Sequence, residues 1–453
     1  NLLLPDDLGL FVTLLLVVTY TASIFALNLG SGIVHKMNLQ DRPDESTRYF
    51  SAGLLATGFL ALTGVVVFYL VKGLVIDLFN VPEASSVIHL TYPLLALTML
   101  RSYFTHVYQA RLHFRQLTLI NTAAAIIQVL VTLLLLYLGK GLNGVFWGLY
   151  VGNLVALLPL SFHSFRLFGM TVDKGTFQNM RSLVGFSSVI FLGSVAVLLD
   201  QRIDLVFVAH FLNNQDVAIY DYVLKFSLLF VLFGNSISRV TYPRFTQAFT
   251  SGSGEGINRL FGYSLNFTFF FLTILSLLFF LHAKVIIDLI LPSFYLQVIP
   301  YLLILLIGVI PKAVVTSVGT LFTARGIPSV SARVNWGLLF INVLLNILLI
   351  PRFGLYGAAI ATTTSFLLKP VIMFVLIARR IGLVYPYVRL LLNFLVFILA
   401  LVGGHLVENF ILRETIILVY LLYCYKIFLG KDEKQYLLSG WYRFNHKVFH
   451  AIR

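Results

Sequence analysis

The stretch RFGLYGAAIATTTSFLLKP, residues 352–370, combines two features that a membrane helix seldom has together. Its first half is built of Gly, Ala and Thr, and Lys369 lies deep inside it. Gly357, Ala361 and Ser365 recur every four residues and therefore form one stripe along a helix face. Small residues in such a stripe let two helix backbones approach closely within lipid. The stretch predicts a tightly packed membrane helix that also carries a charged site.

The whole chain has the composition of a helical membrane protein. Of its 453 residues, 59% are hydrophobic and 11% are charged, whereas soluble domains carry about 25% charged residues. Apolar runs of roughly 18 or more residues recur along the chain, and each can cross the membrane as a helix. These runs lack the period-two alternation of barrel strands. The sequence predicts an all-α polytopic fold, and the single cysteine, Cys424, excludes an intrachain disulfide.

We expect thirteen membrane spans, separated by short connections. Nineteen of the 32 Lys and Arg residues fall on one side of the alternating connections and five on the other. The first side is therefore cytoplasmic, and topology explains the net charge of +14 better than nucleic-acid binding does. The predicted spans are 8–36, 48–71, 85–110, 115–138, 143–166, 180–211, 216–243, 257–282, 297–324, 329–350, 354–380, 386–408 and 412–429.

The opening stretch has an echo earlier in the chain. GLNGVFWGLYVG at 141–152 aligns with GLYGAAIATTTS at 354–365, and Gly144, Gly148 and Gly152 occupy the places of Gly357, Ala361 and Ser365. PDDLGLF at 5–11 likewise resembles NQDVAIY at 214–220. Both copies run in the same direction, which predicts two parallel six-helix repeats. Parallel repeats are typical of secondary transporters with a substrate site between the halves.

The repeat also predicts how the chain is divided. We expect an N-terminal lobe at 1–166, a C-terminal lobe at 167–380, an extra helix pair at 381–429 and a cytoplasmic amphipathic tail at 430–453. The second copy begins with span 180–211, whose counterpart would precede residue 1. We therefore expect that one N-terminal helix is missing from this chain and that the parent protein has fourteen spans.

These residues resemble the polysaccharide transporters, which include the O-antigen and exopolysaccharide flippases of the multidrug/oligosaccharidyl-lipid/polysaccharide exporter superfamily. NVLLNILLIPRFGLYGAAIATTTSFLL at 342–368 resembles the signature of their second repeat. LLLPDDLGLF at 2–11 resembles the family's Gly-Pro-Glu-x-x-Gly-x-Tyr turn. DLVFVAHFLNNQDVAIY at 204–220 resembles the corresponding turn of the second lobe. It departs from that turn at Leu205, where the family has Arg, and at residues 213–215, where the family has Gly-Pro-Glu.

The resemblance implies two lobes in a V around a central cavity. It implies alternating-access transfer of an undecaprenyl-diphosphate-linked oligosaccharide to the outer leaflet of the bacterial cytoplasmic membrane. The glycan would be a repeat unit of O-antigen, capsule or exopolysaccharide. Its partners would be a polysaccharide polymerase and glycosyltransferases, and the chain would be no enzyme.

Several charged residues lie within the predicted spans, where each costs at least ~2.5–3.5 kcal/mol at the helix centre. We interpret them as a cationic cavity wall that attracts the diphosphate; the alternative for Lys369 and Lys312 is an ion pair with an intramembrane Asp. Lys225 follows Asp221 by four residues, so a structural pair competes with the cavity interpretation. Lys369 has no charged counterpart in the first repeat, where Ala156 occupies its place. The candidate substrate-binding cations are Lys369, Lys312, Arg202, Lys225 and Arg101.

Asp200 and Asp204 are spaced to share one face of a continuous helix. Two neighbouring carboxylates raise one another's pKa, which would suit a proton or sodium site coupled to transport. The alternative is that Asp204 is solvated at the outer end of its span. His106, His113 and His210 lack metal-ligand spacing, and the chain has no phosphate-binding loop or nucleophile elbow. We therefore expect no cofactor, no metal and no ATP-driven pump.

Three other functions compete with a glycan flippase. A lipid II flippase of peptidoglycan synthesis would also move a polyprenyl diphosphate across the membrane. A multidrug or cation antiporter of the same superfamily would want acidic residues in its first lobe, and these spans lack an obvious one. A membrane-embedded sugar polymerase or ligase would need large outer loops, whereas the outer connections here are a few residues long.

Overall fold

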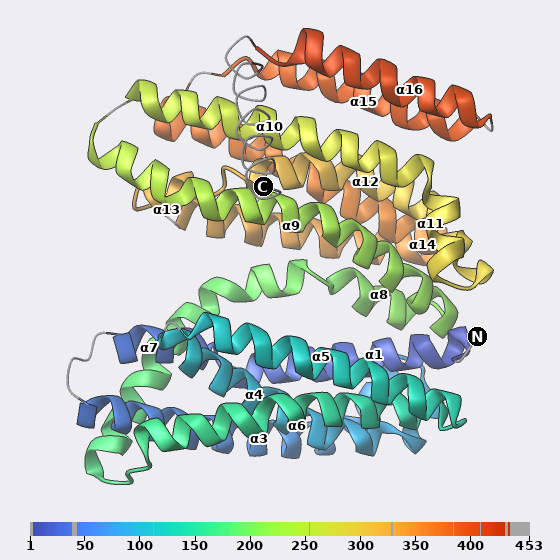
Figure 1. Ribbon diagram of the computed structural model, residues 1–453. Coiled ribbons are helices and arrows are strands. Elements are labelled where there is room, and N and C mark those ends of the chain that lie inside the picture. Colours follow the sequence, from blue (N-terminus) through green and yellow to red (C-terminus); the bar gives the residue numbers. More distant parts are fainter. Residues whose placement is uncertain are drawn as a thin grey trace, which may run out of the picture. The chain divides into compact units, whose positions relative to one another are not determined.

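The structure, a computed structural model, describes residues 3–38, 43–111, 113–252, 254–327, 329–383, 385–407, 409–430 and 434. Within these residues the chain forms helices and no strand, so the predicted all-α membrane fold is confirmed (Figure 1). Nine helical segments of the described chain are long and apolar enough to cross a membrane. The predicted cytoplasmic tail lies almost entirely outside the described residues.

The nine segments and the thirteen predicted spans differ for local reasons. α14 (Ser329–Ile381) contains two predicted spans. It consists of two helices that meet at a kink at Gly354, where φ is 55° and ψ is −134°. The other three predicted spans, 85–110, 180–211 and 412–429, contain helices that are shorter, interrupted or more polar. The first predicted span is itself interrupted, since Leu27 and Asn28 adopt positive φ.

Packing divides the chain into two compact units at Ala218–Ile219. This point differs from the predicted lobe boundary at 166–167, because α7 packs against α2 and α3 of the first unit. The unit boundary is defined by contacts in the structure, whereas the lobe boundary is defined by the repeat in the sequence. The lobe boundary at 166–167 therefore remains a prediction.

Unit 1 is built around one central helix. α4 contacts α1, α2, α3, α5 and α6, so five other helices of the unit pack around it. The helices are α1 (Pro5–Ala26), α2 (Leu29–Asn38), α3 (Pro43–Leu78), α4 (Thr91–Ala110), α5 (Phe114–Tyr137), α6 (Gly141–Phe168), α7 (Lys174–Asp200) and α8 (Ile203–Phe211), with short 3₁₀ helices η1 (Pro82–Ser86) and η2 (Ile88–Leu90).

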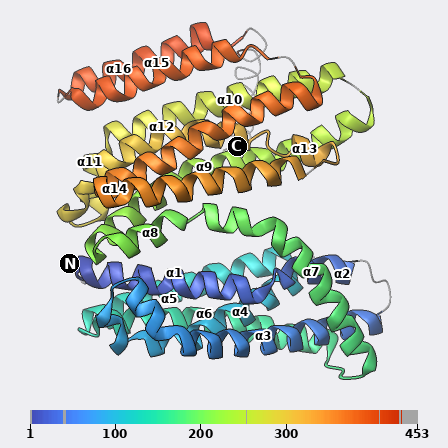
Figure 2. The same cartoon turned by 180° about the vertical axis from the view of Figure 1, so that it is seen from behind.

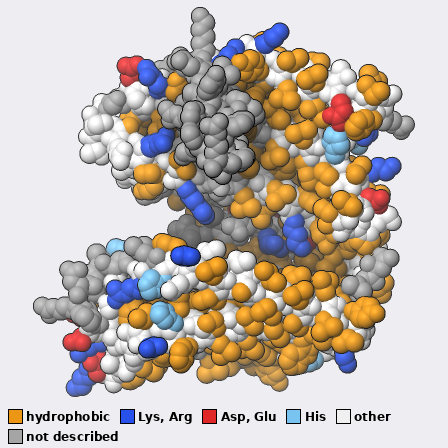
Figure 3. Space-filling model, in the orientation of Figure 1, with side chains coloured by type: hydrophobic (Ala, Val, Ile, Leu, Met, Phe, Trp, Pro, Cys, Tyr) orange, Lys and Arg blue, Asp and Glu red, His pale blue; other side chains and the backbone are white. Residues whose placement is uncertain are grey.

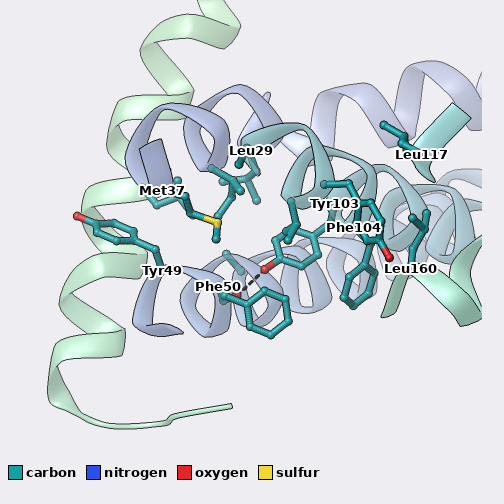
Figure 4. Packing of buried hydrophobic residues seen from close by; sticks show 14 of the residues in the cluster. Leu29, Met37, Tyr49, Phe50, Tyr103, Phe104, Leu117 and Leu160 are labelled. Carbon is teal, nitrogen blue, oxygen red and sulfur yellow. Dashed lines mark hydrogen bonds between the residues drawn. The ribbon is translucent and has the colours of Figure 1, made fainter. Parts of the chain in front are cut away.

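An aromatic core fixes α4 within unit 1 (Figure 4). Phe50 of α3 and Tyr103 and Phe104 of α4 are almost fully buried. The Tyr103 hydroxyl donates a hydrogen bond to the backbone oxygen of Phe50, so the buried phenol is satisfied. Leu160 of α6 and Met37 of α2 complete the core. This packing sets the orientation of the polar face of α4.

Unit 2 consists of a helical layer and a C-terminal hairpin. α12 packs against α10 and α14, and α15 and α16 pack against α10 (Figure 2). The helices are α9 (Asn214–Thr250), which begins in unit 1, α10 (Gly254–Leu281), α11 (Ala283–Ile290), η3 (Ser293–Gln297), α12 (Val298–Thr316), α13 (Leu321–Ala324), α14, α15 (Tyr387–Leu406) and α16 (Phe410–Tyr423), which continues as the π-helix η4 (Cys424–Phe428).

Connections that were predicted on the same side of the membrane meet within each unit. On the predicted cytoplasmic side, Arg48 forms an ion pair with Asp173 at 3.0 Å, and Arg325 donates to the backbone oxygen of Arg380. On the opposite side, the His282 ring lies 2.8 Å from Glu414. Figure 3 shows the same segregation in unit 1, where Lys, Arg and His side chains gather at one end and hydrophobic side chains cover the middle.

Candidate functional sites

Arg101 lies on the central helix α4 and is held by two amide side chains. Its guanidinium donates to Oδ1 of Asn121 on α5 at 2.9 Å and to Oδ1 of Asn153 on α6 at 3.3 Å. Asn153 also donates from its amide nitrogen to the Leu149 backbone oxygen at 2.8 Å, which fixes its oxygen toward the arginine. Three helices thus hold the half-buried guanidinium in one orientation.

The amides leave the positive charge of Arg101 in place. Residues 84–172 contain no Asp or Glu, so α4, α5 and α6 contribute no carboxylate. A neutral amide oxygen satisfies an N–H donor without cancelling the charge. A fixed guanidinium is suited to bidentate recognition of phosphate or carboxylate oxygens. This part of unit 1 therefore favours an anion over a cation.

A groove of about 800 Å³ begins next to this arginine, between α4 and α5, and its mostly apolar lining includes five polar side chains. Asn121 lines it together with Thr105 and Gln109, which follow Arg101 at intervals of four residues on the same face of α4. Thr118 and Thr122 of α5 line the opposite wall. Hydroxyl and amide groups in this arrangement can exchange hydrogen bonds with a polyhydroxylated ligand.

A second charged cluster in unit 1 surrounds a break between two helices. α7 ends at Asp200 and α8 begins at Ile203, with Arg202 at the non-helical φ of −147°. Asp200, Arg202 and Asp204 all lie close enough to interact electrostatically with Tyr20 of α1. The Tyr20 hydroxyl also lies 3.5 Å from the backbone oxygen of Leu199.

The helix break corrects the geometry that was predicted for the two carboxylates. Asp200 and Asp204 do not share one face of a continuous helix, because the backbone changes direction between them. Four of the five residues at 200–204 are polar or charged. Broken helices are tolerated at membrane depth where protein groups satisfy the freed backbone. Asp204 is buried rather than solvated, with 2% of its surface exposed.

The small-residue stripes lie at close helix contacts. A Cβ atom on Gly148 would lie 1.9 Å from Oγ1 of Thr132 on α5, and one on Gly152 would lie 2.7 Å from Cβ of Gln128. Gly144 faces Leu135 in the same seam. In the second copy, Gly357 faces the Leu349 backbone across the turn of α14, and Ala361 and Ser365 are buried.

Lys225 is held in an ion pair within unit 2. Its ammonium lies 2.5 Å from Oδ2 of Asp221, one helical turn away. Asp221 is 1% exposed, whereas the lysine side chain is 47% exposed. The lysine thus neutralises a buried carboxylate. This is the structural ion pair that the sequence suggested as an alternative to a cavity role for Lys225.

Lys312 contacts an aromatic side chain of α14 that lies one helical turn before Lys369. The Lys312 ammonium lies 3.6 Å from the centre of the Phe366 ring, between α12 and α14, and Lys312 is 9% exposed. Lys369 follows Phe366 by three residues, so it lies on the same side of α14. An aromatic face stabilises a desolvated ammonium group. The structure thus brings these two cations to one region of unit 2.

Comparison with known proteins identifies the family. A family model described as polysaccharide biosynthesis protein matches residues 1–300. The chain belongs to this family. The resemblance to the polysaccharide transporters is therefore confirmed at the level of the family.

Individual relatives of this polysaccharide biosynthesis protein are distant. It is 24% identical over 203 residues to the probable low-salt glycan biosynthesis flippase Agl15 of Haloferax volcanii, covering 45% of this chain and 43% of that protein. It is 26% identical over 193 residues to an uncharacterized membrane protein of Methanocaldococcus jannaschii, covering 41% and 37%. The matched region thus spans less than half the length of these curated relatives.

Solved structures share the fold. The lipid II flippase MurJ in an inward closed conformation superposes with a TM-score of 0.73 at 16% identity, covering 93% of this chain and 92% of that one. An inward-facing multidrug resistance transporter of the MATE family superposes with a TM-score of 0.65 at 13% identity, covering 83% and 91%. At these identities the likeness establishes the fold of the superfamily and not the substrate.

Sequence reasoning selected Arg101 but missed the side chains that position it. Asn121 and Asn153 lie on other helices, 20 and 52 residues away, so only tertiary structure brings them to the arginine. Thr105 and Gln109 did carry a signal, because they repeat the four-residue interval from Arg101 along α4. Among the described residues, no group of three or more His, Cys, Asp or Glu side chains is placed to hold a metal ion.

Proposed function

We propose that this polysaccharide biosynthesis protein is a flippase that transfers a polyprenyl-diphosphate-linked oligosaccharide across the cytoplasmic membrane by alternating access. The observation that carries the proposal is the guanidinium of Arg101, fixed by two neutral amides where three helices contribute no carboxylate. Its location beside a groove that carries hydroxyl and amide side chains also favours a ligand with both an anionic and a hydroxylated part.

Each part of the ligand has a matching group. The diphosphate accepts charge-assisted hydrogen bonds from Arg101, which are about twice as strong as neutral ones. The sugar hydroxyls exchange hydrogen bonds with Thr105, Gln109 and Thr118. Lys312 and Lys369 are the proposed cations for an anionic ligand in unit 2, and Arg202 is a further one in unit 1. Lys225 acts chiefly as the partner of Asp221.

Ion coupling is assigned to the break between α7 and α8. Asp200 and Asp204 interact with Tyr20 and Arg202 at a site where the helix is interrupted. Broken helices that carry ionisable side chains are recurrent coupling sites in secondary transporters. Protonation or sodium binding at the carboxylates would change the charge of this cluster and bias the alternation of the two lobes.

The proposal also covers the chemical class of the transported glycan. The family description and the name of the Haloferax relative both support a polysaccharide or glycan precursor. We propose an undecaprenyl-linked repeat unit of O-antigen, capsule or exopolysaccharide in a bacterial cytoplasmic membrane. Glycosyltransferases would supply it and a polysaccharide polymerase would consume it.

A lipid II flippase is the second candidate, because lipid II presents the same diphosphate to the same cations and MurJ shares the fold. A cation-exporting multidrug antiporter is disfavoured by the absence of carboxylates in residues 84–172.

Complementation separates the candidates. The gene, completed with an N-terminal helix if one precedes the chain, is expressed in a strain lacking its polysaccharide flippase and in a strain depleted of its lipid II flippase. We expect surface polysaccharide in the first strain and no rescue of growth in the second. Rescue of the second strain alone would assign the protein to lipid II. Full polysaccharide rescue by the Lys312→Ala, Lys369→Ala double variant would remove these lysines from the proposed substrate site.

A further inference from the structure

A second groove, in unit 2, has the character of a lipid-binding site. It has a volume of about 710 Å³ and separates the second half of α14 from α15, with α10 and α12 contributing to its walls. Its lining is apolar along most of its length: Leu367, Pro370, Val371, Phe374, Val375 and Leu391 are representative. Val371, Val375 and Leu391 are also exposed at the protein surface. A hydrocarbon chain can therefore enter the groove from the side.

The polar groups of this groove are at one end. Arg379 lies in the last turn of α14, on the predicted cytoplasmic side, and Tyr387 opens α15. The Tyr387 hydroxyl is buried and has no hydrogen-bond partner within the described structure. A buried hydroxyl without a partner is costly.

Exposed positive charge gathers at this end of the groove. Arg380 adjoins Arg379, and Arg325 reaches the same turn by donating to the Arg380 backbone oxygen. Residues 289–407 contain no Asp or Glu, so α12, α13, α14 and α15 supply no carboxylate to these arginines. Basic pockets between membrane helices on the cytoplasmic side are established binding sites for anionic lipid headgroups.

The length of the groove indicates which lipid part it holds. From Leu367 to Arg379 the helix rises ~18 Å at ~1.5 Å per residue. One leaflet of a ~30 Å hydrocarbon core is ~15 Å deep. The groove therefore reaches about as far as one acyl chain whose headgroup remains at the cytoplasmic surface. The headgroup of a transported polyprenyl lipid crosses the membrane. Such a lipid needs no fixed binding site for its headgroup at the inner leaflet.

We infer that this groove binds one acyl chain of an anionic phospholipid of the inner leaflet, with its phosphate at the exposed guanidinium of Arg379. The lipid fills the seam between α14 and α15 and stabilises the C-terminal hairpin against the rest of unit 2. This inference concerns a resident lipid and is independent of the transported substrate.

Lipid retention by the purified full-length chain tests the inference. Native mass spectrometry in mild detergent measures bound phosphatidylglycerol, phosphatidylcholine and polyprenyl diphosphate after each lipid is added separately. Thermal unfolding with the same lipids measures stabilisation. We expect preferential retention of phosphatidylglycerol and a higher melting temperature with it than with phosphatidylcholine.

Three variants identify the site. Arg379→Ala removes the headgroup contact and should weaken phosphatidylglycerol retention by about tenfold, the effect of one lost charge-assisted hydrogen bond. Val375→Trp fills the groove and should abolish retention. Arg333→Ala is the matched control, because Arg333 is an exposed arginine near the cytoplasmic end of the same helix, outside the groove. It should retain the lipid like the wild type.

Two results would overturn the inference. One is equal phosphatidylglycerol retention by the wild type and the Arg379→Ala variant. The other is retention of polyprenyl diphosphate in place of phospholipid, lost on Val375→Trp, which would make the groove part of the transport path. If Val375→Trp fails to fold, Arg379→Ala decides the question, since this substitution removes atoms and adds none to the packed interior.

Discussion

The guanidinium of Arg101 and the amide oxygen of Asn121 are 2.9 Å apart, and this hydrogen bond joins the central helix of unit 1 to α5. Because the acceptor is neutral, it orients the arginine and leaves its charge available. If the charge binds the diphosphate, Arg101→Ala should lower the rate of glycan transfer by about 10- to 100-fold, the range for one lost charge-assisted contact. Arg101→Lys should retain part of the activity.

A substitution of Asn121 tests the orientation of Arg101 separately from its charge. Asn121→Ala keeps the charge and loses the anchor, so it should lower activity less than Arg101→Ala does. Arg115→Ala serves as the control, because Arg115 is exposed near the start of α5. Transfer is followed by surface polysaccharide in complemented cells at matched protein levels. Wild-type polysaccharide in the Arg101→Ala strain would remove this residue from the substrate site.

The contact between Gly148 and Thr132 predicts a packing defect that can be rescued. Gly148→Val should destabilise the protein by about 1–3 kcal/mol, because the added atoms overlap Thr132 in the α5–α6 seam. Thr132→Ala should relieve part of that cost when it is combined with Gly148→Val. Gly58→Ala is the control, since a Cβ atom there meets nothing within 4 Å. Thermal unfolding in detergent measures the effect, and equal melting temperatures for Gly148→Val and Gly58→Ala would contradict it.

The Lys225–Asp221 pair predicts a structural and not a transport phenotype. Lys225→Met leaves a buried carboxylate without its ion-pair partner and should destabilise unit 2 by about 1–3 kcal/mol. The double variant Lys225→Met, Asp221→Asn removes both charges and should recover most of that stability. It should also recover transport. A double variant that is stable but inactive would return Lys225 to the substrate-binding set.

The cap of α7 predicts a pH dependence of stability. Hydrogen bonds from the Thr176 N–H and hydroxyl, together with nearby Arg48, lower the pKa of Asp173 below its ordinary value. A lowered folded-state pKa contributes stability above the unfolded value of about 3.9, and that stability is lost as pH falls through the folded value. Asp173→Asn should therefore flatten the melting temperature between neutral pH and pH 3. An unchanged slope in this variant would contradict the assignment.

The sequence predicted the parts of this fold that depend on local pattern. Apolar length identified the spans, and the four-residue spacing of Gly144, Gly148 and Gly152 predicted a close helix seam. The break at 201–202 was missed, because no Pro or Gly marks it and only tertiary contacts with α1 make it visible. Lys312 was predicted as a buried cation, but its contact with Phe366 joins two helices that no local pattern relates.

The most direct test of the account is glycan transfer by the purified protein. The protein is reconstituted in liposomes with a fluorescent polyprenyl-diphosphate oligosaccharide, and a membrane-impermeant reagent reports how much of it changes leaflet. The account predicts transfer by the wild type, strongly reduced transfer by Arg101→Ala, and no transfer of an uncharged polyprenyl glycoside with the same sugar. Equal transfer of the charged and uncharged lipids, unaffected by Arg101→Ala, would contradict the claim that this chain recognises a diphosphate.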